Sequence, residues 1–306
     1  MAVWITGARD RPALCVEDGR IVAEAPLPPA GSEVLDAGGL WLVPAFIDAH
    51  VHMEFVPGAT RALLRAGVAA VLDLGAPERA LPFPGADPLR VRFSGPLLTA
   101  PRGYPTQSWG REGYGLEIAT ARQARAAVGR LAAQGARFAK LAFDPRYPVL
   151  SPEVARAAAE EAHRRSMLVA AHALDPDSVR RALEAGADVF AHAPLEPVSL
   201  AGKWVISTLR AFGGTVRGLG ARVVYGTDLG NEDTSPAIDA RELALLERDG
   251  IDPLLAATSD AADLLGYPDL GRLSVGSAAS LLAVRGLDAE SLAHPVWVMN
   301  CGTVLP

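Results

Sequence analysis

The sequence contains very little lysine. Of its 29 basic residues, 27 are arginine, and Lys140 and Lys203 are the only lysines. A chain that uses arginine almost everywhere needs a specific reason to keep a lysine. Lys140 lies in a predicted strand and Lys203 at the start of another, so we expect a special role for Lys140 and a plain surface charge at Lys203.

Cysteines and long apolar runs are also scarce. Cys15 and Cys301 lie near opposite ends of the chain, so they form no disulfide framework and we expect reduced thiols. No apolar run approaches the roughly 20 residues of a membrane span. The first residues, MAVWITGARD, lack the basic and then apolar pattern of a signal peptide. We therefore expect a cytoplasmic protein.

Positive charge is not in excess and forms no cluster. The chain of 306 residues carries 35 acidic and 29 basic residues, a net charge of −6. This balance argues against a nucleic-acid surface and for a small-molecule substrate, with neither nucleic acid nor membrane as partner. It leaves a homo-oligomer open. Half of the residues are hydrophobic, which is enough for a sizeable core.

The most informative stretch is Trp41–Phe55, WLVPAFIDAHVHMEF. Its apolar first half predicts a buried strand, and its second half brings Asp48, His50 and His52. Alternate residues of a strand point the same way, so the two imidazoles project from one face about 7 Å apart. Two histidines in this arrangement can share a divalent cation, to which each nitrogen binds at about 2 Å.

The rest of the chain alternates strands and helices. We predict an α/β fold, a (β/α)8 TIM barrel over 44–267, with a small β-sandwich domain built from both chain termini, 1–43 and 268–306. The eight predicted strands are Trp41–His52, Val68–Leu74, Arg90–Phe93, Arg137–Phe143, Met167–Ala171, Asp188–Ala191, Trp204–Leu209 and Arg222–Gly226. The predicted helices include Gly58–Ala66, Leu116–Ala133, Pro152–Arg165, Asp177–Ala185, Ala237–Arg248 and Pro253–Leu265, with a short helical turn at Thr215–Leu219.

Polar residues lie at or near the ends of several predicted strands. His172 and His192 end the fifth and sixth strands, Asp228 follows the eighth, and Lys140 lies within the fourth. The carboxyl ends of the strands form the active face of such a barrel. We therefore expect these residues to meet His50 and His52 there.

Five motifs in this order resemble the amidohydrolase superfamily, close to its prolidase-like and imidazolonepropionase-like branch. They are AHVH at 49–52, GARFAKLAFD at 135–144, LVAAHA at 168–173, ALEAGADVFAHAP at 182–194 and VVYGTDLG at 223–230. The segment 256–284 resembles the C-terminal signature of that superfamily, with Ala279-Ser280 in place of the usual Ala-Asp. The resemblance extends over essentially the whole chain.

The resemblance implies a binuclear metal centre. His50, His52 and Asp228 would bind one divalent ion, and His172 and His192 a second. Lys140, carboxylated by CO₂, would bridge the two. Arginine cannot replace it, since a guanidinium stays protonated. Zinc is the default for an imidazole-rich hydrolytic site, with manganese, iron and nickel as alternatives.

The implied activity is metal-dependent hydrolysis of an amide-type C–N bond, in a cyclic amide or an acyl-amino-acid-like small molecule. A metal-bridging hydroxide would attack the carbonyl. Asp228 would take its proton and pass it to the leaving group, which makes Asp228 and Lys140 the catalytic residues.

Two other functions remain open. A lactone or ester hydrolase would use the same centre. A non-hydrolytic or ligand-binding barrel is the other, because only 36 residues separate His192 from Asp228. That span has to contain a helix, a strand and another helix, which makes the seventh unit short. A deaminase is disfavoured, because that branch works with one metal and without a carboxylated lysine.

Substrate contacts are expected from residues beside the metals and from the long Gly/Pro/aromatic loop Ser94–Gly115. The aromatic residues of that loop suggest a partly apolar substrate. The candidates are Glu54, Phe55, Tyr104, Trp109, Tyr114, Arg146 and Asn231.

Overall fold

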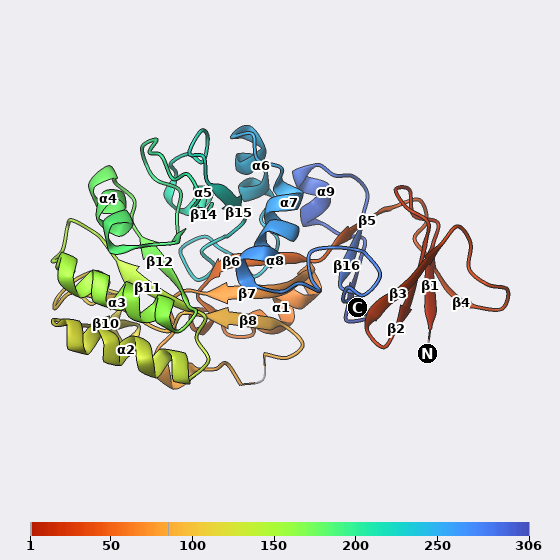
Figure 1. Cartoon of the computed structure of the whole chain (residues 1–306). Coiled ribbons are helices and arrows are strands. Elements are labelled where there is room, and N and C mark those ends of the chain that lie inside the picture. Colours follow the sequence, from red (N-terminus) through yellow and green to blue (C-terminus); the bar gives the residue numbers. More distant parts are fainter. Residues whose placement is uncertain (1, 85, 306) are drawn as a thin grey trace.

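A computed structural model describes residues 2–84 and 86–305 of the chain. It divides into a barrel and a smaller part made of two sheets, and both chain ends lie in the smaller part (Figure 1). The expected fold class, an α/β barrel with an appended β domain from both ends of the chain, is therefore confirmed.

The smaller part consists of two four-stranded sheets. One has the order β3-β2-β1-β4 and contains β1 (Val3–Thr6), β2 (Ala13–Glu17), β3 (Arg20–Ala25) and β4 (Glu33–Asp36). The other has the order β18-β17-β16-β5 and contains β5 (Trp41–Pro44), β16 (Leu281–Val284), β17 (Trp297–Asn300) and β18 (Thr303–Leu305). Ile5 and Leu14 of the first sheet share a buried core with Leu42 and Leu281 of the second. The division at residues 44 and 268 stays a prediction.

The barrel is built from parallel strands in two hydrogen-bonded groups. The first is β6 (Phe46–Val51), β7 (Val68–Asp73) and β8 (Arg90–Phe93); the second is β10 (Gly115–Glu117), β9 (Leu97–Thr99), β11 (Phe138–Ala142), β12 (Leu168–His172), β13 (Val189–Phe190), β14 (Trp204–Ile206) and β15 (Arg222–Val224). The Ala49 amide donates to Tyr225 and the Asp228 amide donates to His50, which joins β15 to β6 and closes the barrel.

The third strand of the barrel is interrupted. β8 pairs with β7, whereas β9 pairs with β11. Between them Gly95 has φ +76°, in the left-handed region that favours glycine, and Pro96 follows. With β8 and β9 taken as one bent strand, the barrel has the eight strands that the sequence predicts.

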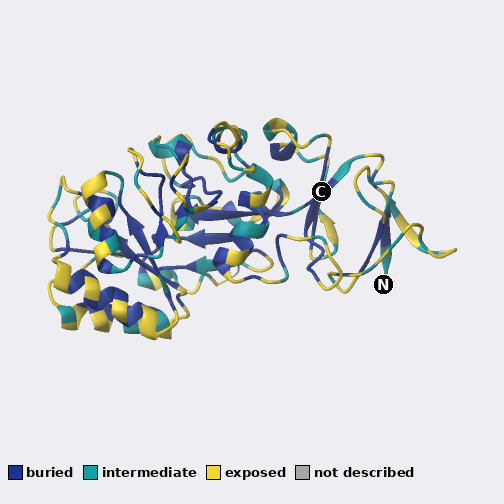
Figure 2. Ribbon diagram, turned by 45° about the horizontal axis from the view of Figure 1, so that its top comes forward, coloured by how far each residue is buried: buried dark blue, intermediate teal, exposed yellow. Residues whose placement is uncertain are grey.

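Helices cover the outside of the barrel, and Figure 2 shows their outward faces exposed around buried strands. The helices of the described residues are α1 (Ala59–Ala66), α2 (Ala121–Ala133), α3 (Pro152–Arg164), α4 (Pro176–Ala185), α5 (Leu209–Phe212), α6 (Ala240–Arg248), α7 (Pro253–Ala257), α8 (Ser259–Leu265) and α9 (Ala289–Ala293), with 3-10 turns η1 (Met53–Phe55), η2 (Glu78–Ala80) and η3 (Arg111–Gly113). Of these, α5 and η1 lie at the cavity, and α9 belongs to the chain segment between β16 and β17. Ser151 caps α3, as predicted, by accepting a hydrogen bond from the Val154 amide.

Three predicted helices differ from the structure by more than one residue at an end or are divided. The helix expected from Leu116 begins at Ala121, because Thr120 and Gln123 form a capping box and residues 115–117 form β10. The helix expected from Ala237 begins at Ala240, behind the N-cap Asp239. The helix expected at 253–265 is divided at Thr258, whose φ and ψ of −126° and −93° are not helical.

The segment between the sixth and eighth strands differs most from the prediction. No helix follows β13, because Pro194 and Pro197 interrupt 191–203. The strand expected to reach Leu209 ends at Ile206, and Leu209 begins the single turn α5. The helical turn predicted at 215–219 is irregular, after the glycines at 213 and 214.

Two further expectations concern cysteines and membranes. Cys15 and Cys301 are both free thiols, as expected. Across residues 2–84 and 86–305, every helix falls short of the length and apolar character that crossing a bilayer requires.

Candidate metal centre

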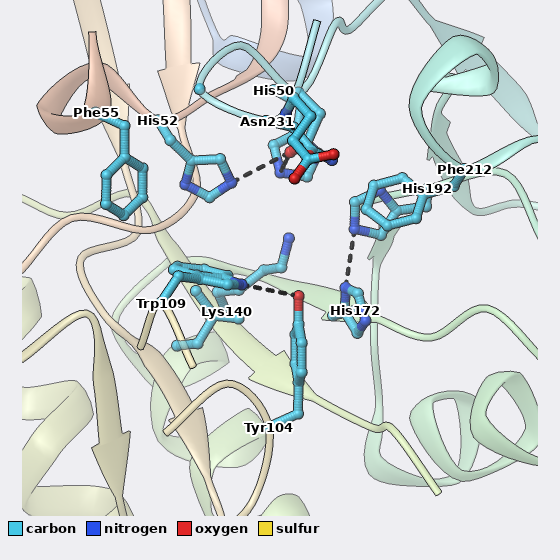
Figure 3. A pocket seen from close by; sticks show the side chains of 14 residues that line it. His50, His52, Phe55, Tyr104, Trp109, Lys140, His172, His192, Phe212 and Asn231 are labelled. Atoms are coloured by element: carbon cyan, nitrogen blue, oxygen red, sulfur yellow. Dashed lines mark hydrogen bonds and ion pairs between the residues drawn. The ribbon is translucent and has the colours of Figure 1, made fainter. Parts of the chain in front are cut away.

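The carboxyl ends of the barrel strands surround a cavity of about 380 Å³ (Figure 3). All six predicted metal-binding residues line it, although they come from five different strands or the segments directly after them. Its full lining is His50, His52, Phe55, Leu97, Tyr104, Trp109, Lys140, His172, His192, Phe212, Asp228, Gly230, Asn231 and Glu232. The convergence that strand parity and strand ends predict is therefore present.

His50, His52 and Asp228 form a compact group of ligand atoms. The Asp228 Oδ1 atom lies 3.1 Å from His50 Nε2 and 3.2 Å from His52 Nε2. Two atoms bound at about 2 Å to a tetrahedral ion are roughly 3.3 Å apart. One ligand atom from each residue lies within 4.8 Å of the others, and all three residues are buried. This spacing fits a shared cation.

Two buried atoms of this group lack a hydrogen-bond partner among the described residues. They are Asp228 Oδ1 and His52 Nδ1. A buried polar atom without a partner is costly, and it commonly marks the place of an ion or water. The orphaned carboxylate oxygen faces both histidines, so a cation bound there would satisfy it.

The orientation of His50 is fixed by the backbone. Its Nδ1 atom lies 2.8 Å from the Ala191 carbonyl oxygen, so Nδ1 carries the proton and Nε2 keeps a free lone pair. Asp48, which is buried, accepts hydrogen bonds from the His50 and Thr227 amides at 3.0 and 3.1 Å. It also accepts one from the Thr227 hydroxyl at 2.5 Å. Asp48 therefore ties β6 to the segment that carries Asp228.

His172 and His192 form the second pair of imidazoles. Their Nδ1 and Nε2 atoms are 2.9 Å apart. The other nitrogen of His192, Nδ1, lies 3.0 Å from the hydroxyl of Thr208. Both rings are buried at the ends of adjacent strands. The pair therefore offers two nitrogens to one point beside the first group.

The protonation states favour metal binding. Burial lowers the pKa of His50 and His192 well below the usual value, and that of His172 to about 3. Burial alone would raise the pKa of Asp228, but the neighbouring imidazoles, His50 first, hold it well below its usual value. The site therefore presents neutral imidazoles and an ionised carboxylate, the forms that bind metal.

Lys140 extends from β11 into the centre of the group. It is 1% exposed, and its amine points into the space between His50, His52 and His172 (Figure 3). Burial lowers its pKa from 10.5 to about 7, with Asp228 and Asp73 opposing that shift. Much of this amine is therefore neutral near pH 7, unlike a surface lysine.

Glycines make room for the first histidine pair. A Cβ atom on Gly75 would lie 2.6 Å from the His52 ring atoms Cε1 and Nδ1. A Cβ atom on Gly226 would lie 2.3 Å from Ile206 Cγ2 and 3.0 Å from His50 Cβ. Asp73 accepts hydrogen bonds from the Met53 and Gly75 amides at 2.7 and 3.0 Å, which holds the segments on both sides of His52 together.

The structure separates the predicted substrate contacts into two groups. Tyr104, Trp109, Asn231 and Phe55 line the cavity, whereas Glu54, Tyr114 and Arg146 lie outside its lining. Tyr114 stacks on the outer side of Phe55, with ring centroids 4.6 Å apart. Arg146 forms a two-pronged ion pair with Asp144, at 3.0 and 2.7 Å.

Other residues of the site were not predicted. Phe212 of α5 packs on His192, with ring centroids 4.2 Å apart, and Glu232 lies at the rim. Asp48, Asp73 and Thr208 support the ligands without lining the cavity. The Asp48 in AFIDAHVH and the Thr208 after the seventh strand were visible in the sequence, but nothing in the pattern showed what they would touch.

Tyr104 and Trp109 act as a pair. The Trp109 indole donates a hydrogen bond to the Tyr104 hydroxyl oxygen at 3.1 Å. The Tyr104 ring stacks on His172, with centroids 4.5 Å apart, and burial raises the pKa of Tyr104 to about 12. The phenol is therefore protonated, its oxygen accepts from Trp109, and its hydrogen remains available to the cavity.

Comparison with known proteins places this arrangement in a family. The sequence profile of the Amidohydrolase family matches residues 41–197. An uncharacterized protein of Mycobacterium tuberculosis is 29% identical over 197 residues, covering 58% of this chain and 50% of the relative. The chain therefore spans about half the length of the curated relatives it matches.

Solved structures agree in fold. A putative prolidase from Bifidobacterium longum has a TM-score of 0.80 and 26% identity, over 100% of this chain and 94% of that one. Phenylurea hydrolase B has a TM-score of 0.76 and 19% identity, over 100% and 97%. These likenesses support the predicted fold. Because the profile matches half of the sequence, this chain belongs to the amidohydrolase family.

Proposed function

We propose that this protein is a metal-dependent hydrolase that cleaves an amide-type C–N bond with two divalent ions, zinc by default. One observation carries the proposal. Five separate strands, or the segments directly after them, bring four imidazoles, one ionised carboxylate and one lysine with a lowered pKa into the same cavity. A barrel core without a metal would have little reason to bury these six polar groups together.

The donors divide naturally between two ions. His50, His52 and Asp228 would hold one, as their spacing of 3.1 and 3.2 Å indicates. His172 and His192 would hold the other. Imidazole and carboxylate donors suit zinc, and also manganese, iron and nickel. Thr208 and the Ala191 carbonyl would orient the ligating rings from behind.

Lys140 would join the two ions as a carbamate. The neutral amine adds to the carbon of CO₂, which forms an N–C bond, and a proton leaves the nitrogen. The product is an anion with two oxygens, and its burial requires cations beside it. The lowered pKa of Lys140 supports this step, since only the neutral amine has the lone pair that attacks CO₂.

Bound divalent ions would lower the pKa of a water molecule and polarise the scissile carbonyl. Asp228 is the one buried carboxylate of the cavity lining, so it would accept the proton of the attacking water and deliver it to the leaving nitrogen. Asn231 Nδ2 donates to Asp228 Oδ2 at 3.0 Å and holds that carboxylate in place. Tyr104 would donate its free hydrogen to an acceptor on the substrate.

The names of the neighbours support an amide rather than an ester. Prolidases recur among the similar structures, one of them complexed with N-methylphosphonate-L-proline, and another neighbour is a phenylurea hydrolase. These names refer to C–N bonds. They also differ in the charge of the ligand, since proline carries a carboxylate and a phenylurea is neutral.

The test uses protein expressed with bicarbonate and zinc, assayed against a panel of chromogenic amides, lactones and esters. Asp228→Asn should lower kcat/KM by about 10²- to 10⁴-fold, the usual contribution of a positioned proton carrier. Lys140→Arg should lose the bridge and most of the activity. The matched controls are Asp18→Asn, in an exposed turn, and Lys203→Arg, and both should keep full rate.

Two results would contradict the proposal. One is an Asp228→Asn variant with near wild-type turnover. The other is a Lys140→Arg variant that keeps two bound ions. Circular dichroism of each variant shows whether it still folds, so that a loss of activity can be assigned to the missing side chain. Faster turnover of lactones than of amides would favour the other candidate function, a lactone or ester hydrolase that uses the same centre.

A further inference from the structure

We propose that the cavity selects uncharged or cationic amides that carry an aromatic or apolar group, and that it rejects substrates with a free carboxylate. This inference rests on the proposed function, because it names the substrate class of that site. It narrows the expected acyl-amino-acid-like substrate, which would bring a carboxylate into the cavity.

Aromatic side chains form much of the wall beyond the ligands. Trp109 lies edge-on to His52 and to Phe55, with ring centroids at 5.2 and 5.9 Å. Phe212 covers His192 from another element, α5. Figure 3 shows Trp109 and Phe212 on different sides of the central space. A flat or apolar group between these rings would be desolvated on both faces.

The side chains that line the cavity offer no free positive charge for a carboxylate. Among the described residues that line it there is no arginine, and its single lysine, Lys140, is the proposed bridging ligand. Arg146, which lies outside the lining, is paired through two nitrogens with Asp144. Recognition of a carboxylate normally uses an arginine fork or another free donor of positive charge.

Arg210, which precedes Phe212 on α5, is also paired with groups outside the cavity. Its guanidinium contacts the Asp239 carboxylate and the Asp233 carbonyl. Neither Arg146 nor Arg210 therefore directs a free guanidinium at the cavity.

The rim carries negative rather than positive charge. Glu232 lines the cavity and is exposed, and it has no ion-pair partner in the described part of the chain. Beside it, the amide of Asn231 already donates to Asp228. A carboxylate entering past Glu232 would be repelled, whereas a neutral or cationic group would not.

The Tyr104 hydroxyl, a hydrogen-bond donor in the cavity lining, suits an uncharged acceptor on the substrate. The Tyr104 oxygen accepts from the Trp109 indole at 3.1 Å, which leaves the phenolic hydrogen for the cavity. A carbonyl oxygen is satisfied by one such donor, whereas a carboxylate needs several donors or a cation to replace its hydration.

The test is a charge series on one scissile bond. The compounds are 4-acetamidobenzoate (anionic), 4-acetamido-N-methylbenzamide (neutral) and 4-acetamidobenzylamine (cationic), which share the same acetanilide bond. Binding is measured by calorimetry on the full chain, both metal-free and zinc-loaded. The metal-free form removes any attraction of the carboxylate to zinc. Hydrolysis is measured separately as kcat/KM.

We expect the neutral and cationic compounds to bind at least about tenfold more tightly than the anion, in both forms, as repulsion at a charged rim predicts. Glu232→Arg should reverse the order of the cation and the anion, and Glu232→Gln should reduce their difference without reversing it. Arg146→Ala should leave the order unchanged. Trp109→Ala should weaken all three, since it removes part of the aromatic wall.

The outcomes separate the two proposals. Preferred binding of the neutral and cationic compounds without any hydrolysis would contradict the proposed function and support the substrate class. Hydrolysis that prefers the anion, with this preference lost in Arg146→Ala, would overturn the proposed substrate class. It would leave the proposed function standing. Absence of binding by all three compounds would also overturn the substrate class.

Discussion

His192 shows how a candidate ligand depends on residues that sequence patterns do not mark. Its ring is held between His172, at 2.9 Å, and the hydroxyl of Thr208, at 3.0 Å. Thr208 has φ +40°, which is unusual for a β-branched residue. The strained backbone places this hydroxyl beside Nδ1 of His192. The strain therefore helps to orient the imidazole if His192 binds a metal.

Thr208→Val tests this support. Valine keeps the branched shape and removes the hydroxyl, so His192 would lose the partner that fixes its tautomer. We expect zinc affinity to fall by about 10- to 100-fold with little change in fold, as for other partners of metal-bound histidines. Zinc titration of Thr208→Val and of a control, Thr303→Val on the exposed strand β18, measures it. Unchanged affinity would contradict the orienting role.

Gly75→Ala tests the close approach to His52. The added Cβ would lie 2.6 Å from the imidazole, so the ring has to leave the position in which its Nε2 atom lies 3.2 Å from Asp228 Oδ1. We expect at least a tenfold loss of zinc affinity. The control is Gly129→Ala in α2, whose Cβ would meet only the flexible end of Arg165, at 3.2 Å, and which should be neutral or mildly stabilising. Equal zinc affinity in both variants would show that His52 is not positioned in this way.

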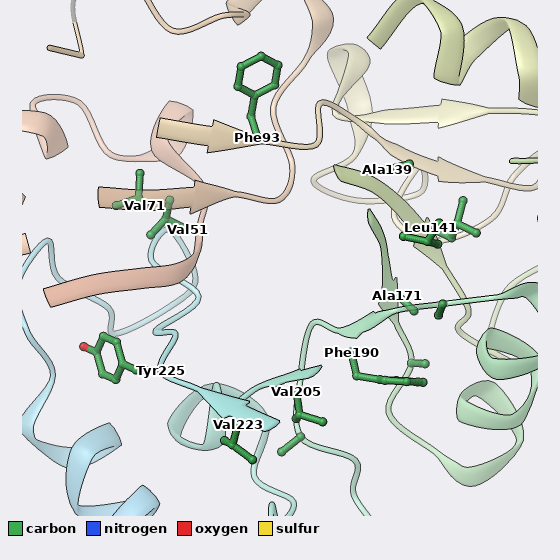
Figure 4. Close-up of a cluster of buried hydrophobic side chains, with 14 of the residues drawn as sticks. Val51, Val71, Phe93, Ala139, Leu141, Ala171, Phe190, Val205, Val223 and Tyr225 are labelled. Carbon is green, nitrogen blue, oxygen red and sulfur yellow. The ribbon is translucent and has the colours of Figure 1, made fainter. Parts of the chain in front are cut away.

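The direction in which Lys140 points depends on its place in β11, because alternate residues of a strand point to opposite sides. Along β11, Phe138 packs in the barrel interior, whereas Ala139 and Leu141 belong to the outer core that faces the helices (Figure 4). Lys140 therefore points inward with Phe138. The sequence leaves this direction open, because all five residues of β11 are buried and their pattern shows no polar face.

At the scale of the elements, helix starts follow from capping residues rather than from apolar periodicity. In α2 the Thr120 hydroxyl accepts from the Gln123 amide at 3.2 Å, and Gln123 reaches back to the Thr120 amide at 3.1 Å. The helical pattern of the sequence extends back to Leu116, but residues 115–117 pair with β9 as strand β10.

Thr120→Ala should therefore lower the free energy of unfolding by about 1 kcal/mol, the usual cost of losing an N-cap. The same change should leave zinc affinity unchanged, because α2 lies on the outside of the barrel. Arg122→Ala is the control, because Arg122 lies in the same first turn and its side chain makes no hydrogen bond to any residue that the structure describes. Urea unfolding of both variants measures the difference, and equal midpoints would contradict the capping role.

The strands and their polar ends could be predicted from the sequence, and the connections could not. Buried strands appear as short apolar runs, and His50, His172 and Asp228 follow such runs directly. The segment between β13 and β15 shows the limit. Its prolines and glycines exclude long helices, but their pattern does not place Phe212 over His192. Long-range contacts such as Asp48 with Thr227 depend on barrel closure, which local patterns do not contain.

At the scale of the whole molecule, the barrel gathers at one end the polar and ionisable side chains whose burial costs free energy. Its strands and the segments after them bury four histidines, Lys140 and the aspartates at 48, 73 and 228 in the same region. Asp48 is 1% exposed, and this burial raises its pKa to about 7. Bound cations would offset the cost of burying these groups.

Metal binding should therefore stabilise the whole barrel. A ligand that binds only the folded state adds about 2.7 kcal/mol when its concentration is 100 times its Kd. We expect the Tm to rise when zinc is added to chelated protein, and to rise less in Lys140→Arg than in Lys203→Arg. Calorimetry with and without zinc provides the comparison. A Tm that does not respond to zinc would argue against a built metal site.

The most direct test of the central claim is the metal content per chain. It is measured by mass spectrometry of metals on protein expressed with bicarbonate and zinc, then freed of loosely bound ions. The binuclear, lysine-bridged centre predicts about two equivalents in the native chain and fewer in Lys140→Arg. One equivalent or none in the native chain, or two in Lys140→Arg, would contradict it.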